Sequence, residues 1–216
     1  MPIRRALACA LLCLASLPAF ALSEQGQQQL QTLQQRWAEI NYQLPKAQRE
    51  KAFASLSEQA QKALAAEPTS AELHIWNGII LSTYAGAKGG LGALGLVKQA
   101  KASLEQGLAL DPEALAGSAY TSLGSLYYQV PGWPLGFGDE AKAEAMLKQA
   151  LTINPDGIDP NYFYGDYLAR AKRFDEARAA LEKALQAPPR PDRLSADAGR
   201  QEEIRALLNT VKAELE

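Results

Sequence analysis

Residues 120–155 of this chain of 216 residues read YTSLGSLYYQVPGWPLGFGDEAKAEAMLKQALTINP, and their pattern is the clearest indication of its architecture. The first part of this stretch carries residues at the intervals of one helix face: Tyr120, Leu123, Gly124 and Tyr127. Its last part does the same with Ala143, Leu147 and Ala150, and ends at Pro155. Residues three and four apart share one face of an α-helix, so the stretch predicts two helices that pack on each other. The segment between them, rich in glycine, proline and aromatic residues, predicts a loop.

These intervals resemble the tetratricopeptide repeat, a helical hairpin with the patterns W-x2-L-G-x2-Y and A-x3-F-x2-A-x4-P. Two other parts of the chain fit the same patterns. The earlier part has His74, Asn77, Gly78 and Leu81, then Ala100, Leu104, Gly107 and Pro112. The later part has Asn161, Tyr164, Gly165 and Leu168, then Ala177, Leu181, Ala184 and Pro189. The chain departs from the family at the tryptophan position, which His74, Tyr120 and Asn161 occupy.

The resemblance implies an all-α solenoid of about four hairpins, because a single hairpin cannot bury both of its faces and neighbours must stack. We expect a degenerate N-terminal hairpin at 22–68, where two apolar stripes end at Pro45 and Pro68. Three repeats follow at 69–114, 115–157 and 158–191. Residues 192–216 carry one apolar face and one charged face and predict the C-terminal capping helix that an open solenoid requires.

Small residues and surplus residues refine this prediction. We expect Gly78, Gly124 and Gly165 to face the first alanine of the partner helix, where the lack of bulk lets two helices approach closely. The interval from glycine to alanine is longer in the second and third hairpins than in the fourth. We assign the surplus to inter-helix loops at 85–96 and 130–138, which should lie side by side on one edge of the solenoid.

The first 21 residues have the features of a secretory signal peptide. Arg4 and Arg5 are positive, residues 6–17 form an apolar run, and Ala19-Phe20-Ala21 is an A-x-A cleavage site. A membrane anchor is the alternative, but the run falls short of the roughly 20 residues that span a bilayer. Cleavage after Ala21 predicts a location in the periplasm or outside the cell, with no membrane span in the mature chain.

The charge of the mature chain disfavours nucleic acid as a partner. Without Arg4 and Arg5 the 22 basic residues become 20, against 24 acidic ones, which gives a net charge of −4. Nucleic-acid binding needs a basic stripe. Both cysteines lie in the signal segment, so the mature chain contains no cysteine and stability must come from apolar burial.

No motif predicts catalysis, a cofactor or a metal. The G-x-G-x-x-G pattern at 90–95 lacks the preceding strand that a dinucleotide site needs. A lone His74 without cysteine cannot build a zinc site, and no G-x-S-x-G elbow accompanies it. Several aspartates precede expected helices, and Asp159 before Pro160 predicts an N-cap followed by a first-turn proline. We therefore expect a protein that is not an enzyme.

Aromatic residues give the best indication of a binding site. Nine of the sixteen lie between Tyr120 and Tyr167, which concentrates them in the later hairpins. The resemblance implies that certain first-helix positions line an inner groove, among them Tyr128, Gln129, Tyr162, Asp166 and Arg170. The loop adds Trp133 and Phe137, which either stand exposed as partner anchors or fold back and become buried. These seven residues are the candidate partner-binding site.

The resulting hypothesis is an exported scaffold or adaptor that binds a protein or peptide in the cell envelope. One alternative is a small-molecule binder, in which the aromatic patch closes over a ligand in a pocket. In its long loops and its signal peptide the chain also resembles, more weakly, the periplasmic T-component of tetratricopeptide-associated TRAP transporters. That resemblance implies a helper protein that associates with a solute-binding protein and itself forms an oligomer.

Overall fold

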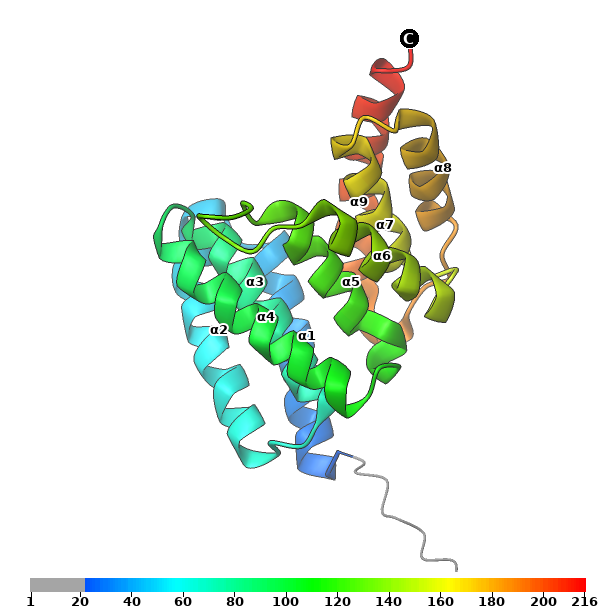
Figure 1. Cartoon of the computed structure of the whole chain (residues 1–216). Coiled ribbons are helices and arrows are strands. Elements are labelled where there is room, and N and C mark those ends of the chain that lie inside the picture. Colours follow the sequence, from blue (N-terminus) through cyan, green and yellow to red (C-terminus); the bar gives the residue numbers. More distant parts are fainter. Residues whose placement is uncertain (1–21) are drawn as a thin grey trace, which may run out of the picture.

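The computed structural model describes residues 22–216, so the predicted signal peptide at 1–21 lies outside the described residues. Within this range the chain is helical and contains no strand, which confirms the all-α prediction (Figure 1). The α-helices are α1 (Glu24–Tyr42), α2 (Lys46–Ala66), α3 (Ala71–Lys88), α4 (Gly92–Leu110), α5 (Ala114–Gln129), α6 (Glu140–Ile153), α7 (Ile158–Arg170), α8 (Phe174–Leu185) and α9 (Leu194–Ala213). A single 3-10 turn, η1 (Pro191–Arg193), precedes α9. Of the helices described, none is long and apolar enough to cross a membrane.

Consecutive helices pair as hairpins and stack in the order of the chain. The helices α3 and α4 form the most extensive pair, followed by α5 with α6 and α7 with α8. The first helices of successive hairpins also contact each other, so α3, α5 and α7 form a continuous layer. This arrangement of stacked hairpins is the one that the tetratricopeptide resemblance implies.

The crossing points of the three repeats confirm the predicted close approach of glycine and alanine. A Cβ atom added at Gly78 would lie 3.0 Å from the carbonyl oxygen of Ala100 in the partner helix. The corresponding distance is 3.2 Å from Gly124 to Ala143 and 3.5 Å from Gly165 to Ala177. At each crossing a buried leucine fills the space beside the glycine: Leu104, Leu147 or Leu181. The three hairpins therefore share one packing geometry.

The prediction of a loop at 85–96 is wrong. Helix α3 continues to Lys88 and α4 begins at Gly92, so only residues 89–91 connect them. Ala85 and Val97 are buried in the core that the two helices share, and this apolar burial outweighs the conformational cost of glycine in a helix. Gly89 and Gly90 have positive φ angles of 65° and 56° and make the turn. The surplus residues therefore lengthen this hairpin instead of forming a loop.

The segment 130–139 joins α5 to α6 and is ordered by backbone hydrogen bonds. The amide of Gly136 donates to the carbonyl oxygen of Gly132 at 3.1 Å, and the amide of Gly138 donates to that of Pro131 at 3.0 Å. The amide of Asp139 donates to the carbonyl oxygen of Tyr127 at 2.8 Å, which ties the end of the loop to α5. Asp139 then caps α6 by accepting from the amide of Lys142 at 3.0 Å. The loop therefore holds a defined shape.

The C-terminal helix α9 packs on α8, as a cap of the last hairpin does, and it also reaches α1 at the other end of the chain. The hydroxyl of Tyr42, the last residue of α1, donates to a carboxylate oxygen of Glu203 in α9 at 3.2 Å. Ala196 of α9 belongs to the apolar cluster of α1, α2 and α3, whereas Ile204 and Leu208 belong to the cluster of the later hairpins. The helix α9 thus joins the first and last parts of the solenoid.

Candidate functional site

Four of the seven candidate residues come together at the carboxyl ends of α5 and α7. The hydroxyl of Tyr128 donates to the carboxylate of Asp166 at 2.7 Å, and the side-chain amide of Gln129 donates to that hydroxyl at 3.2 Å. Arg170 donates to the same carboxylate at 3.2 Å, and its guanidinium carbon lies 5.3 Å from the centroid of the Tyr128 ring. The cluster joins two neighbouring hairpins, and its outer members Gln129 and Arg170 are exposed.

Tyr128 is held in its protonated state. Burial, reinforced by the negative charge of Asp166, raises the pKa of Tyr128 well above its ordinary value. The protonated hydroxyl can therefore act as a permanent donor to the carboxylate. This hydrogen bond and the contact with Arg170 fix the geometry of the cluster.

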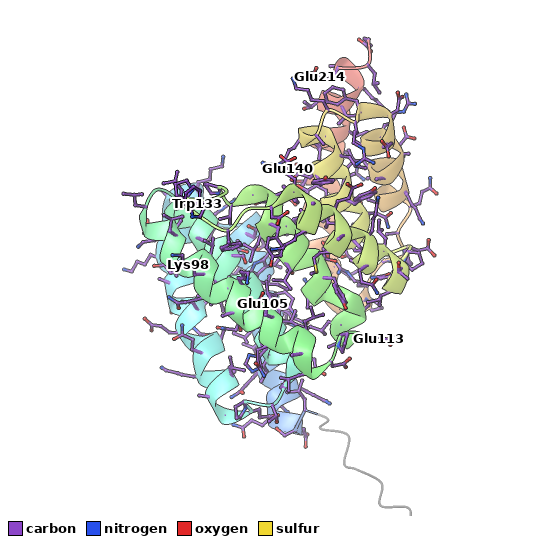
Figure 2. The ribbon with its side chains drawn as sticks, in the orientation of Figure 1. Lys98, Glu105, Glu113, Trp133, Glu140 and Glu214 are labelled. Atoms are coloured by element: carbon purple, nitrogen blue, oxygen red, sulfur yellow. The ribbon has the colours of Figure 1, made fainter. Side chains whose placement is uncertain are left out.

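The loop 130–139 presents its two most exposed apolar side chains to solvent. The side chain of Trp133 is 90% exposed, and that of Leu135 is 66% exposed. Figure 2 shows Trp133 on the loop, away from the interior of the hairpins. An indole this exposed on an ordered loop makes no contribution to the core, so its apolar surface remains free for another molecule.

Phe137 folds back, unlike Trp133. Its ring meets that of Tyr127 edge to face, with centroids 5.8 Å apart. The ammonium group of Lys101 in α4 lies 5.8 Å from the Phe137 ring and 6.0 Å from the Tyr127 ring. The sequence left open whether the aromatic residues of the loop are exposed or fold back. Trp133 is exposed, and Phe137 folds back. Phe137 anchors the loop, and Trp133 projects from it.

Tyr162 lies apart from these residues, in a charged cluster that sequence reasoning missed. The guanidinium carbon of Arg200 in α9 lies 4.4 Å from the centroid of the Tyr162 ring and 4.8 Å from that of Phe163. The same guanidinium donates to Asp159 at 2.9 Å and to Glu203 at 2.6 Å. Arg190, in the segment before α9, donates to the other oxygen of Asp159 at 2.8 Å.

Asp159 is the centre of this cluster. The sequence predicted that it would cap α7, and this prediction is wrong. The helix begins at Ile158 with Gly157 at the cap position, which leaves the Asp159 side chain free to face α9. Burial acts to raise the pKa of Asp159, but the charges of Arg200 and Arg190 outweigh burial and hold this pKa well below its ordinary value. Asp159 is therefore a carboxylate at neutral pH, bonded to two guanidinium groups.

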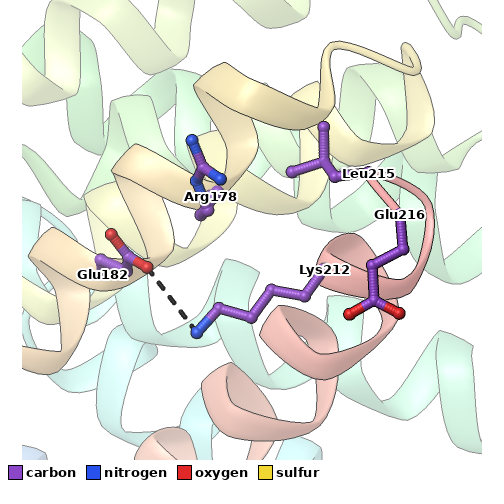
Figure 3. A pocket seen from close by; sticks show the side chains of 5 residues that line it. All are labelled: Arg178, Glu182, Lys212, Leu215 and Glu216. Atoms are coloured by element: carbon purple, nitrogen blue, oxygen red, sulfur yellow. Dashed lines mark ion pairs between the residues drawn. The ribbon is translucent and has the colours of Figure 1, made fainter.

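Two surface hollows lie away from the aromatic candidates. One, of about 470 Å³, lies between α8 and α9 and is lined by Arg178, Glu182, Lys212, Leu215 and Glu216. Its side chains are mostly charged, and Lys212 pairs with Glu182 across it at 3.8 Å (Figure 3). The other lies beside the start of α1 and the turn after α2. None of the seven candidate residues lines either hollow.

Comparison with protein families finds repeats of the expected type in one part of the chain. The tetratricopeptide repeat family model matches residues 135–198, which supports repeats of this type in the later part of the chain. No curated protein sequence matches the chain. Among solved structures, it is similar to the crystal structure of MamA, with 21% identity, coverage of 78% of this chain and 92% of that one, and a TM-score of 0.44. It is also similar to a thermophilic TPR protein of Thermus thermophilus, with 17% identity, coverage of 87% of this chain and 99% of that one, and a TM-score of 0.46.

Proposed function

We propose that this protein is an exported, non-enzymatic scaffold or adaptor that binds a protein or peptide partner in the cell envelope. The tetratricopeptide-type repeats support a role in protein interaction, since folds of stacked hairpins offer extended binding surfaces. The features of a signal peptide, with cleavage after Ala21, support export. The binding surface in this proposal is the edge that carries the loop 130–139.

The observation that carries the proposal is the exposure of Trp133 on an ordered loop. A large aromatic side chain has few rotatable bonds, and on an ordered backbone it loses little conformational freedom when a partner covers it. Leu135 widens the apolar surface, and the hydrogen bonds within the loop hold the backbone that carries both side chains. These two residues are the anchors of the proposed site.

The cluster of Tyr128, Gln129, Asp166 and Arg170 supplies a polar border in this proposal. It begins at the end of α5, where the loop also starts. Exposed polar groups around an apolar anchor are typical of protein interfaces. A small-molecule site is less well supported, because the described hollows are lined by other residues and Trp133 stands in solvent instead of closing over a cavity.

Affinity capture from a periplasmic extract tests the proposal with three forms of the mature chain. These are the unchanged protein, Trp133→Ala/Leu135→Ala, and Leu110→Ala, which removes an exposed leucine from the end of α4. We expect one protein to be retained by the unchanged chain and by Leu110→Ala, and lost with the double variant. Equal retention by all three would disprove the assignment of the site to the loop.

A further inference from the structure

The N-terminal half of α9, together with Arg193 directly before it, lies against three helices from distant parts of the chain. Arg193 faces α3, where its guanidinium carbon lies 4.8 Å from the centroid of the Trp76 ring. Gly199 and Glu203 face Tyr42 at the end of α1, and Arg200 faces α7. The helices α1, α3 and α7 are the first helices of their hairpins, which the repeat resemblance places on the inner face. The chain therefore fills part of its own inner face with a segment from its C-terminus.

This segment is held mainly by arginine chemistry. Arg190 and Arg200 share the carboxylate of Asp159. The backbone amide and the guanidinium of Arg190 also donate to the carboxylate of Asp197, each at 2.8 Å. Arg193 and Arg200 also lie over aromatic rings of α3 and α7, where a cation is attracted by the ring face. The side chain of Arg200 is 9% exposed, so its charge depends on these partners.

The C-terminal half of α9 is attached differently. Ile204, Leu208 and Val211 belong to the apolar core of the later hairpins and hold this half on the solenoid. The segment from Gln186 to Arg193, which contains three prolines, separates α8 from α9. One half of the helix is thus anchored by apolar burial and the other by ion pairs and ring contacts, and these respond to different perturbations.

Close packing of α9 on α1 depends on the absence of a side chain at one position. A Cβ atom at Gly199 would collide with the ring of Tyr42. The surface that meets the other helices therefore consists of Arg193, in the turn before α9, and of Ala196, Gly199 and Arg200 within α9. A segment of the same kind fits this surface, because Ala196, Gly199 and Arg200 are three or four positions apart and share one face of α9. Arg193, directly before the helix, extends this contact to Trp76.

We infer that α1, α3 and α7 form a binding site for an arginine-bearing helix, and that the N-terminal half of α9 occupies this site within the same chain. A partner helix that presents two guanidinium groups at the spacing of Arg193 and Arg200 competes with α9 for Asp159, Tyr162 and Trp76. The site is distinct from the loop edge at Trp133 and does not depend on the function proposed for that edge. Release of the N-terminal half of α9, with its C-terminal half still anchored, makes this surface available to a partner of this chemistry.

A peptide that copies the occupant tests the inference. The probe is a fluorescein-labelled peptide of residues 188–205, titrated with the full mature chain and followed by fluorescence anisotropy. In the unchanged protein the tethered segment competes at an effective concentration of roughly 1 mM, so the peptide should bind weakly. In Arg193→Ala/Arg200→Ala the tethered copy is weakened while the receiving surface is intact. We expect this variant to bind the peptide at least about tenfold more tightly.

Three controls isolate the site. Adding Asp159→Asn to the double variant should abolish the gain, because the receiving carboxylate is lost. A peptide in which Arg193 and Arg200 are both replaced by alanine should not bind. The variant Arg178→Ala/Arg205→Ala removes two exposed arginines outside the site and should behave like the unchanged protein. If the folded double variant binds the peptide no better than the unchanged protein, the inference is overturned and this half of α9 is a fixed structural element.

Hydrogen exchange of the unchanged protein gives a second test that needs no variant. The inference expects amides 198–203 to exchange through local opening, faster than amides 204–211 of the same helix. Exchange of both halves at the rate of global unfolding would overturn it. This measurement decides the question even where the double variant fails to fold.

Discussion

Replacing Asp159 by asparagine removes the negative charge that Arg190 and Arg200 share, and keeps the size of the side chain. Breaking a buried ion pair by removing one partner costs about 3–5 kcal/mol, because the other charge is left uncompensated. Asp159 keeps 29% of its side-chain surface exposed, and water can partly replace its charge. We therefore expect a loss at the lower end of this range, about 3 kcal/mol.

Urea denaturation followed by circular dichroism at neutral pH measures this loss, with Asp175→Asn as the matched control. Asp175 also pairs with an arginine, at 3.1 Å, but its side chain is 77% exposed. An exposed pair contributes at most about 1 kcal/mol, so the control should cost much less. A loss for Asp159→Asn no larger than that of the control would refute the argument that burial makes this charge important.

The stability difference between the unchanged protein and Asp159→Asn should also depend on pH, in a direction set by the pKa of Asp159. The pKa of Asp159 is lower in the folded protein than its ordinary value, so the folded state favours the carboxylate. Its contribution is complete above the pKa of the unfolded chain, about 4, and is lost as the pH falls through the lower folded value. The difference in stability between the unchanged protein and Asp159→Asn should therefore be constant near neutral pH and shrink below about pH 4.

Three further predictions concern the backbone, the helix crossings and export. Ala116 is exposed and has a φ angle of 53°, so Ala116→Gly should raise the free energy of unfolding by about 0.5–1 kcal/mol in urea denaturation, and a loss of stability would contradict this. In the same assay Gly124→Ala should cost about 2 kcal/mol, because the new Cβ would lie 2.7 Å from Leu147, whereas Gly86→Ala meets open space in a helix and should be neutral or stabilising. Amino-terminal sequencing of the protein from a periplasmic fraction should begin at Leu22, and an uncleaved chain would contradict the predicted signal peptide.

Local patterns made the hairpins predictable from the sequence. Gly124 and Ala143 are separated along the chain by a loop, yet each lies at a fixed interval within its own helix, so the crossing could be placed. The glycines at 86–95 indicate a loop, but the burial of Ala85 and Val97 extends both helices into this segment. Glycine content indicates a turn but does not fix where the flanking helices end.

The contact between α9 and the inner face could not be placed in the same way. Asp159 precedes a proline, which favoured a cap, and its true partner Arg200 lies 41 positions later in the chain. One signal was present in the sequence. Arg200 lies four residues before Ile204, so it continues the apolar stripe of α9 at a position where a charge needs a specific partner. A cation within an apolar stripe indicates a buried contact, although it does not identify the carboxylate that receives it.

The contact between α1 and α9 also fixes the number of repeats. An open solenoid can gain or lose a hairpin by duplication or deletion, because each unit touches only its neighbours. Here the first helix meets the last, and an extra hairpin between them would separate Tyr42 from Glu203 by roughly 10 Å, the spacing of neighbouring packed helices. Changes of length are therefore compatible with this architecture in the turns between helices, while an added or deleted hairpin between α1 and α9 would break their contact.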